Sequence, residues 1–318
     1  MTGYKFRLLG IALLFFCSGL SQAGEQAPVL INTQHLLVNK ILDVKAGQFI
    51  DEAALISRIL NSEYLLLGEN HDNRRHHQLE AQVIDWLRQQ QRPASVSFEM
   101  ITHQQAALLK QHSYTSSAQL IKLLNQEKNN WFYKRDYQVV FDSVIAAGFK
   151  MLPANLNRKK ISQIIEQGET KLPEEIGQML TGSPLSAKQI SDLQNEIVQA
   201  HCNMIPPEAT QPMVLVQRVR DAVMSLSLLN SQAVMKVLIA GVGHTRMDRG
   251  VPFYLRDHVK DARIVSLAFQ EVKQEATHIK DYSERWDGQE LPFDYVWFTP
   301  AVQRADPCVT LKHRFKQQ

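Results

Sequence analysis

The chain has 318 residues and a formal net charge of +3 at pH 7. Its basic residues are interspersed with acidic ones rather than gathered in a stripe, so no nucleic-acid partner is expected. No stretch rich in Gly, Ser or Pro divides the sequence, although a chain of this size could form one large domain or two small ones. We therefore predict a single α/β domain over residues 24–318, preceded by an export signal.

The first 23 residues have the pattern of a cleavable signal peptide. Lys5 and Arg7 precede an apolar run over residues 8–16, and the small residues Ser21 and Ala23 precede the expected cleavage point. The apolar run is much shorter than the roughly 20 residues of a membrane-spanning helix, so a membrane anchor is the less favoured alternative. Removal of the signal lowers the formal net charge from +3 to +1, because two basic residues leave with it.

Three cysteines bear on the compartment of the protein. Cys17 lies within the signal and raises the alternative of a lipoprotein, but Phe16 stands where a lipidation signal has a small residue. We therefore favour a soluble or peripheral protein over a lipid-anchored one. Export would place Cys202 and Cys308 where oxidation is permitted. A disulfide between these two residues and a pair of buried free thiols are both open alternatives.

The predicted elements begin with a small β-hairpin formed by residues 41–44 and 48–50 around Gly47, and Asp51 is placed to cap a helix over 52–60. Short runs of β-forming residues then alternate with segments of helical period. The core strands are expected at 64–67, 94–98, 150–154, 235–240 and 264–269, with a further strand at 295–298 at an edge of the sheet. This alternation predicts an α/β fold with a mainly parallel central sheet flanked by helices.

The helix after the first core strand carries an apolar stripe. Leu79, Val83 and Leu87 recur at helical spacing, so one face of this helix should pack on the sheet. His76 and His77 lie in its polar first turn, which we interpret as exposed and solvated. We therefore expect these two histidines to take little part in ligand binding.

A helical insertion is predicted at about 156–233, because this stretch contains no convincing strand. Its helices are broken by prolines and by one glycine, and the insertion should cover an edge of the sheet as a lid or subdomain. Within it, the helix over 213–229 places Gln217 and Asp221 on one face, since they are four residues apart. These two side chains suit either a buried polar network or the lining of a crevice.

Polar residues follow several of the predicted core strands. Glu69 and His71 follow the first core strand, Glu99 follows the second and His244 follows the fourth. The two histidines each end a Gly-x-x-His turn. Because ligands of open α/β sheets collect beyond the carboxyl ends of the strands, we expect these four side chains to meet in one crevice.

Two carboxylates and two imidazoles are suited to two kinds of chemistry. Glu69, His71, Glu99 and His244 could hold a divalent metal, or could act as general acids and bases on a bound water. The helical His-Glu-x-x-His motif of metalloproteases is absent from the sequence. The alternative is a structural role, in which the same groups hydrogen-bond loop amides and cap helices. We favour the functional interpretation because four such groups converge.

An aromatic and basic stretch over residues 131–137 is predicted to open a helix. Aromatic walls and basic side chains would suit a flat apolar ligand that carries carboxylates. Packing in the core is the simpler explanation of such aromatic residues.

Several ordered motifs resemble those of one family. The Leu-Leu-Gly-Glu-Asn-His-Asp-Asn stretch at 66–73 and the Ala-Gly-Val-Gly-His stretch at 240–244 are the strongest. Further matches lie at 76–77, 98–100, 217–224, 249–252, 294–300 and 306–308. Together these motifs resemble the ChaN family of iron-regulated, haem-binding envelope proteins. That family lies within the wider group of Tiki, TraB and erythromycin-esterase proteins.

The resemblance implies an α/β core with a helical insertion and export to the periplasm or to the periplasmic face of the outer membrane. It also implies haem binding in haem or iron uptake or storage, with a tyrosine as the iron ligand. Tyr137 and Tyr133 are the candidate ligands here, with Tyr114 as a third. Further implied features are dimerisation on haem binding and a partner in the haem-uptake machinery that the sequence does not identify.

The wider group implies a second function. Its paired glutamates and Gly-x-x-His turns match Glu69, His71, Glu99 and His244, which would support an esterase or a peptidase. A haem ring needs a broad apolar wall, whereas these four side chains form a compact charged crevice. We therefore expect the haem site and the Glu/His cluster to be two separate places.

Overall fold

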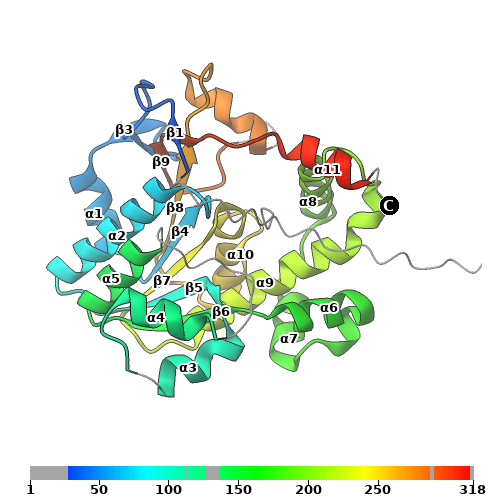
Figure 1. Cartoon of the computed structure of the whole chain (residues 1–318), viewed down its shortest axis with the longest axis horizontal. Coiled ribbons are helices and arrows are strands. Elements are labelled where there is room, and N and C mark those ends of the chain that lie inside the picture. The colour runs from blue at the N-terminus through cyan, green and yellow to red at the C-terminus, as the bar shows by residue number, and fades with distance from the viewer. Residues whose placement is uncertain (1–27, 112, 127–136, 287–289, 316–318) are drawn as a thin grey trace, which may run out of the picture.

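The computed structural model describes residues 28–111, 113–126, 137–286 and 290–315 (Figure 1). The export signal predicted over 1–23 therefore lies outside the described residues. Within the described part of the chain, no helix combines the length and the apolar character needed to cross a membrane.

An eight-stranded sheet forms the centre of the molecule, with the strand order β3-β2-β9-β8-β4-β7-β5-β6. Its strands are β2 (Ile41–Asp43), β3 (Gln48–Ile50), β4 (Tyr64–Glu69), β5 (Ala94–Thr102), β6 (Lys150–Asn155), β7 (Met235–Gly241), β8 (Ile264–Glu271) and β9 (Tyr295–Thr299). The strands from β9 to β6 in this order run parallel to one another, and β2 pairs antiparallel with both β9 and β3. The predicted α/β fold with a mainly parallel central sheet is confirmed. A separate two-stranded pair joins β1 (Leu30–Ile31) and β10 (Ala301–Val302).

The strand predicted at 295–298 exists, but its predicted position at an edge is wrong. β9 lies between β8, with which it pairs in parallel, and β2, with which it pairs antiparallel. The β2–β3 hairpin continues the sheet beyond β9, and all five residues of β9 are consequently buried. β3 and β6 are the edge strands of this sheet.

The helix after the hairpin begins as its sequence indicates. Asp51 accepts a hydrogen bond from the backbone N–H of Ala54 at 2.8 Å, which satisfies one of the free amides in the first turn of α1 (Glu52–Leu60). Gly47 turns the preceding hairpin with a φ of +64°, a value that favours glycine.

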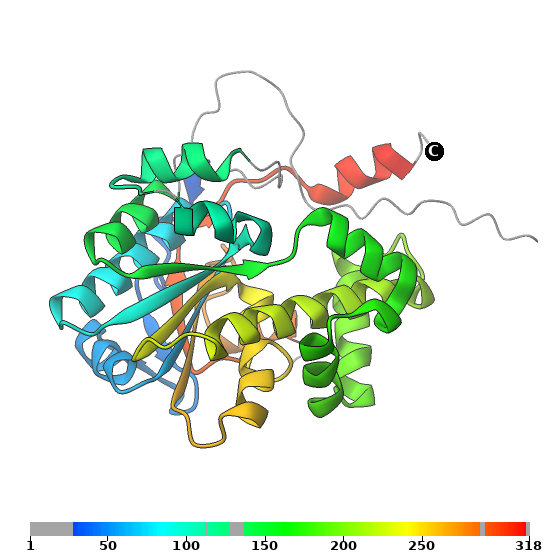
Figure 2. The same cartoon turned by 90° about the horizontal axis from the view of Figure 1, so that it is seen from below.

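Helices cover both faces of the sheet (Figures 1 and 2). Leu65 and Leu67 of β4 join a core cluster with α1, α2 (Arg74–Gln89), α4 (Ser117–Leu124) and α5 (Gln138–Ala146). Leu66 points the other way, because side chains alternate along a strand, and it packs with α9 (Gln211–Leu229) and α10 (Val251–His258). The remaining α-helices are α3 (Ala106–Gln111), α6 (Arg158–Gln167), α7 (Glu174–Gly182), α8 (Ala187–Ala200) and α11 (Pro307–Phe315).

The stretch between β6 and β7 consists of helices joined by loops and turns, and it contains no strand. It contains α6, α7, α8 and α9, and all of its residues are described. Apolar side chains of α6 and α7 pack against α9 in a cluster of their own, which includes Ile164, Met179 and Val223. Figure 2 shows α6, α7 and α8 gathered around one end of α9, to one side of the sheet.

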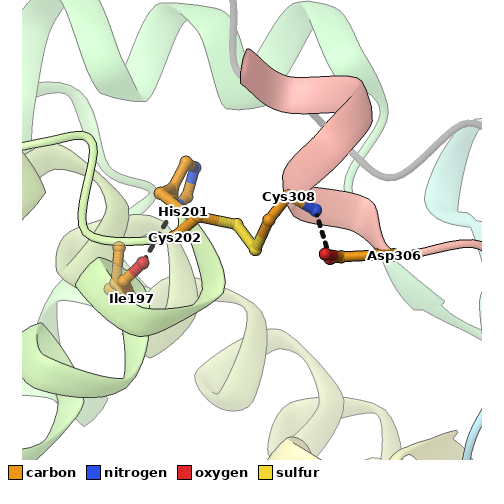
Figure 3. The surroundings of a disulfide bond; sticks show 5 residues. All are labelled: Ile197, His201, Cys202, Asp306 and Cys308. Carbon is orange, nitrogen blue, oxygen red and sulfur yellow. Dashed lines mark hydrogen bonds between the residues drawn. A yellow bond between two sulfur atoms is a disulfide. The ribbon is translucent and has the colours of Figure 1, made fainter.

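A disulfide joins Cys202, just after α8, to Cys308 in α11 (Figure 3). The two residues are 106 positions apart, so the bond fastens the C-terminal helix to the helical insertion. Of the two alternatives left open by the sequence, the paired state is the one in the structure. A disulfide of this kind is typical of oxidising compartments outside the cytosol.

Candidate functional site

The carboxyl ends of three adjacent strands form the floor of the site. β7 lies between β4 and β5, and the register places Glu69 beside Gly241 and Phe98 beside Ile239. Residues that follow these positions in the chain therefore emerge at one edge of the sheet. Glu99 follows Phe98 directly within β5.

The structure brings the four predicted residues together at this edge. His71 Nδ1 lies 2.9 Å from Glu69 Oε1, and His71 Nε2 lies 3.4 Å from Glu99 Oε2. His244, in the 3-10 turn Val242–Thr245, lies with its Nε2 3.5 Å from Glu99 Oε1. The side chains thus alternate in charge along a row from Glu69 to His244. Only the His71 side chain, 33% exposed, is open to solvent to a substantial degree.

Helix α9 extends this row from the other side. Asp221 Oδ1 lies 2.6 Å from His244 Nδ1, and Gln217 Nε2 lies 3.1 Å from the same nitrogen. The spacing by four that the sequence shows places both side chains over His244. Their contacts with His244 form a polar network, which is one of the two alternatives for this helix face.

Two residues join the cluster that the sequence interpretation did not expect there. The Tyr137 hydroxyl donates a 2.6 Å hydrogen bond to Glu69 Oε1 and lies 3.2 Å from His71 Nδ1. His77 Nε2 lies 2.7 Å from Glu69 Oε2, and its ring packs against that of Tyr137 with centroids 4.0 Å apart. Glu69 is thus approached by a tyrosine and by two histidines.

The prediction that His76 and His77 are solvated is wrong, because both are fully buried. The first turn of α2 packs on the edge of the sheet instead of facing water. His76 accepts a hydrogen bond from the Asn70 backbone N–H at 2.9 Å through Nδ1, and its Nε2 lies 2.8 Å from Thr299 Oγ1. The sequence contained a signal for this burial: His76 lies three residues before Leu79 and so continues the apolar stripe of the helix.

The three candidate haem ligands lie in different surroundings. Tyr137 is buried at the start of α5, inside the Glu/His cluster. Tyr114 is half-buried and packs against the large core cluster. Tyr133 and the rest of the aromatic stretch up to residue 136 lie outside the described residues.

Two glycines allow the strand ends to come this close. A Cβ on Gly68 would lie 2.2 Å from Thr245 Oγ1 and 3.2 Å from the backbone of Val242, so a side chain there would push β4 away from the turn after β7. A Cβ on Gly241 would lie 2.9 Å from His71 Nε2. The Gly241 backbone N–H also donates a 2.8 Å hydrogen bond to Glu99 Oε2, which fixes that carboxylate.

Electrostatics in the cluster favour charged side chains in spite of burial. Burial alone would raise the carboxyl pKa values, but the imidazoles of His77 and His71 lower the pKa of Glu69, and those of His244 and His71 lower that of Glu99. Burial likewise opposes protonation of His71, yet the Glu99 and Glu69 carboxylates raise its pKa well above the usual value. The accessible imidazole of the site is therefore protonated at neutral pH.

His244 and Asp221 form a second pair of this kind. Burial disfavours charge on both, but Glu99 and Asp221 raise the pKa of His244 to about 9. The pKa of Asp221 is raised by burial to about 6, because the attraction of His244 offsets only part of that effect. Between about pH 6 and pH 9, the pair is an ion pair.

We predict that the ion pair of His244 with Asp221 makes the free energy of unfolding decrease as the pH becomes alkaline. A raised folded pKa means that the stabilisation is complete below the unfolded value of about 6.5 and is lost as the pH rises through about 9. Asp221→Asn should lower the His244 pKa toward its ordinary value and flatten this loss of stability. NMR titration of the histidine rings, with urea unfolding between pH 6 and pH 10, measures both effects. An unchanged His244 titration in the variant would contradict the pairing.

No curated protein matches the chain at a significant level. Among solved structures, the ChaN protein of Campylobacter jejuni, described as binding haem cofacially, is 22% identical with a TM-score of 0.65, over 81% of this chain and 95% of that one. An erythromycin esterase, EreC, in its open conformation is 10% identical with a TM-score of 0.45, over 85% of this chain and 99% of that one. A family model described as "Haem-binding uptake, Tiki superfamily, ChaN" matches residues 55–255. The chain belongs to this ChaN family.

Proposed function

We propose that this protein binds haem in the bacterial envelope and takes part in the uptake or storage of haem iron. The observation that carries the proposal is the family match over residues 55–255, which includes both Gly-x-x-His turns and the aromatic stretch. The ChaN fold of the Campylobacter jejuni protein, which binds haem, supports the same function. On the family resemblance we also propose that haem binding brings two copies of the chain together, and that haem is exchanged with uptake machinery not yet identified.

A second part of the proposal concerns location. We place the protein in the periplasm or at the periplasmic face of the outer membrane, without a lipid anchor. The export pattern of the first 23 residues supports this, and so does the Cys202–Cys308 disulfide, which needs an oxidising compartment.

Export can be tested on the protein recovered from the envelope of its bacterial host. Cleavage after Ala23 should leave Gly24 as the first residue, because small residues precede that bond. Intact-mass measurement and N-terminal sequencing give the answer. A chain that begins at a diacylated Cys17 would show instead that the protein is lipid-anchored.

The surroundings of the haem-binding segment support a site beside α4 and α5. Residues 127–136 connect these two helices, and a hollow of about 510 Å³ lies next to the ends of the segment. The hollow is lined by Ala118, Ile121, Lys122, Asn125, Gln126 and Gln138. Lys122 is the cation in this lining and could pair with a haem propionate.

The contacts of Tyr137 favour its neighbour Tyr133 as the iron ligand. The Tyr137 hydroxyl donates a hydrogen bond to Glu69. If the Tyr137 oxygen bound iron instead, this hydrogen bond would break and the Glu69 carboxylate would lose a donor. Burial and the charges of Glu69 and Glu80 also raise the pKa of Tyr137 well above its usual value, which opposes the phenolate that iron requires. Haem bound to this segment would supply a ferric iron centre, and the chain would supply the phenolate, the aromatic wall and the basic partner.

A matched set of tyrosine variants tests this assignment. Titration of the purified protein with ferric haem should give a high-spin spectrum with phenolate-to-iron charge transfer. Tyr133→Phe should abolish that absorption, because it removes the ligand oxygen alone, whereas Tyr137→Phe and Tyr114→Phe should keep it. Loss in Tyr137→Phe instead would mean that this side chain leaves Glu69 to bind iron. If the wild-type protein binds no haem at all, the proposed function is wrong.

Acid–base catalysis, as in a hydrolase, is the second candidate function, and one observation favours it. His71 is partly exposed and protonated, and it is held between two buried carboxylates. Such an imidazolium could donate a proton to a leaving group, while Glu99, fixed by Gly241, could orient water or accept a proton. The Asp221–His244 pair would hold Glu99 from behind.

Glu99→Ala separates the two functions. Hydrolysis of esters or peptides, if present, should fall at least about a hundredfold, because a positioned acid–base group is lost. Haem affinity should stay nearly unchanged, because the haem site lies elsewhere. Glu208→Ala, an exposed carboxylate of the helical insertion, is the control for both assays. Loss of haem binding in a folded Glu99→Ala protein would show that haem and the cluster share one site.

A further inference from the structure

A second group of side chains lies deeper than the Glu/His row, between β4 and α2. This group consists of Glu69, His77 and Glu80. Each residue has one potential ligand atom, and the three atoms all lie within 4.8 Å of one another. All three residues are buried, with at most 1% of their surface exposed. His71 and Glu99 are not members of this group.

The local sequence explains why the three side chains converge. His77 and Glu80 are three residues apart on α2, so they lie on the same face of the helix, one turn from each other. That face packs on the sheet, because Val83 and Leu87 continue it further along α2 in the main core cluster. Glu69 is the last residue of β4 and meets the first two turns of the helix there.

These side chains have polar atoms that the protein itself leaves unsatisfied. Among the described residues, the buried atoms without a hydrogen bond include both carboxyl oxygens of Glu80, both ring nitrogens of His77, and Glu69 Oε2. His77 Nε2 does lie 2.7 Å from Glu69 Oε2, but not in the direction of a hydrogen bond. Burying such groups without partners is costly, and native structures rarely tolerate it. A bound cation would satisfy all three residues at once.

Tyr137 holds the Glu69 carboxylate in place for binding a cation. Its hydroxyl donates to Glu69 Oε1, which leaves the other oxygen, Oε2, 2.7 Å from His77 Nε2. Its ring packs against His77 and so restricts the imidazole. Groups that hold the ligands of a metal in place are a regular part of metal sites.

We propose that Glu69, His77 and Glu80 form a binding site for a first-row divalent cation such as Mn²⁺, Fe²⁺ or Zn²⁺. Two carboxylate oxygens and one imidazole nitrogen are ligands that these ions share, and the two negative charges would offset the charge of the ion. Ligands about 2.1 Å from a metal lie roughly 3 to 4 Å apart. The three ligand atoms already lie within 4.8 Å of one another, so small shifts would suffice, with His77 Nε2 and Glu69 Oε2 moving slightly apart from their present 2.7 Å. The ion would enter past His71, the exposed residue above Glu69.

This site differs from the metal site that the sequence suggested. His71, Glu99 and His244 already contact one another in the Glu/His row, and Gly241 and Asp221 complete their contacts. The alternative to a cation is that the protein holds Glu80 neutral, since burial and the charge of Glu69 both raise its pKa. The experiment has to separate these two states.

Metal binding can be measured on the full exported protein after treatment with EDTA. Isothermal titration with Mn²⁺ and with Zn²⁺, in separate runs, should show one strong site for at least one ion. A saturating ion should raise the unfolding temperature by about 5 °C at a hundredfold excess over its dissociation constant. Glu80→Gln and His77→Gln should each weaken binding at least about tenfold and remove the shift in unfolding temperature.

Two control variants locate the ion. Asp85→Asn changes a partly exposed carboxylate on the same helix and should bind metal like the wild type. His244→Gln removes an imidazole of the Glu/His row and should do the same. Loss of binding in His244→Gln with retention in Glu80→Gln would move the metal to the Glu/His row and overturn the proposal. So would wild-type affinity in both Glu80→Gln and His77→Gln, or a wild-type protein that binds neither ion.

The thermal stability of a Glu80→Met variant tests the proposal without an activity assay. In metal-free protein the substitution should raise the unfolding temperature, because it replaces an unpartnered buried carboxyl with an apolar side chain of similar length. Added metal should no longer stabilise this variant. If Glu80→Met is less stable than the metal-free wild type, the protein itself satisfies the carboxyl and the proposal fails. Haem titration of the same variants reports separately on the proposed haem function.

Discussion

The burial of the Glu69 carboxylate at the end of β4 is the constraint on which the rest of the site depends. A charged group with 1% of its surface exposed is tolerated only when opposite charges and hydrogen-bond donors surround it. Tyr137 and His71 provide these contacts at Oε1, and the His77 ring lies beside Oε2. Each of these three residues comes from a different segment of the chain. The need to surround the Glu69 carboxylate therefore holds the loop after β4, the start of α2 and the start of α5 next to one another.

The site has two halves, and the sheet separates them. On one face, α2 and α5 bring His77, Glu80 and Tyr137 to Glu69. On the other face, α9 brings Asp221 and Gln217 to His244. His71 joins the halves, because its two ring nitrogens contact Glu69 at the end of β4 and Glu99 within β5. A change of charge in one half can therefore reach the other through a single partly exposed imidazole.

The proposed haem segment and the polar cluster are separate in their chemistry but adjacent along the chain. The aromatic stretch ends at Tyr137, whose hydroxyl is the link to Glu69.

The sequence by itself determined the strands, the α/β class and the meeting of Glu69, His71, Glu99 and His244 at one edge. It could do so because runs of β-forming residues mark strands, and because polar residues that follow parallel strands must emerge on the same side. Only the tertiary structure decided which elements pack over that edge. It buried His76 and His77, placed β9 inside the sheet, paired Cys202 with Cys308 and brought Tyr137 to Glu69. These outcomes depend on contacts between segments far apart in the chain, and local spacing fixes only which face a residue occupies, not what covers that face.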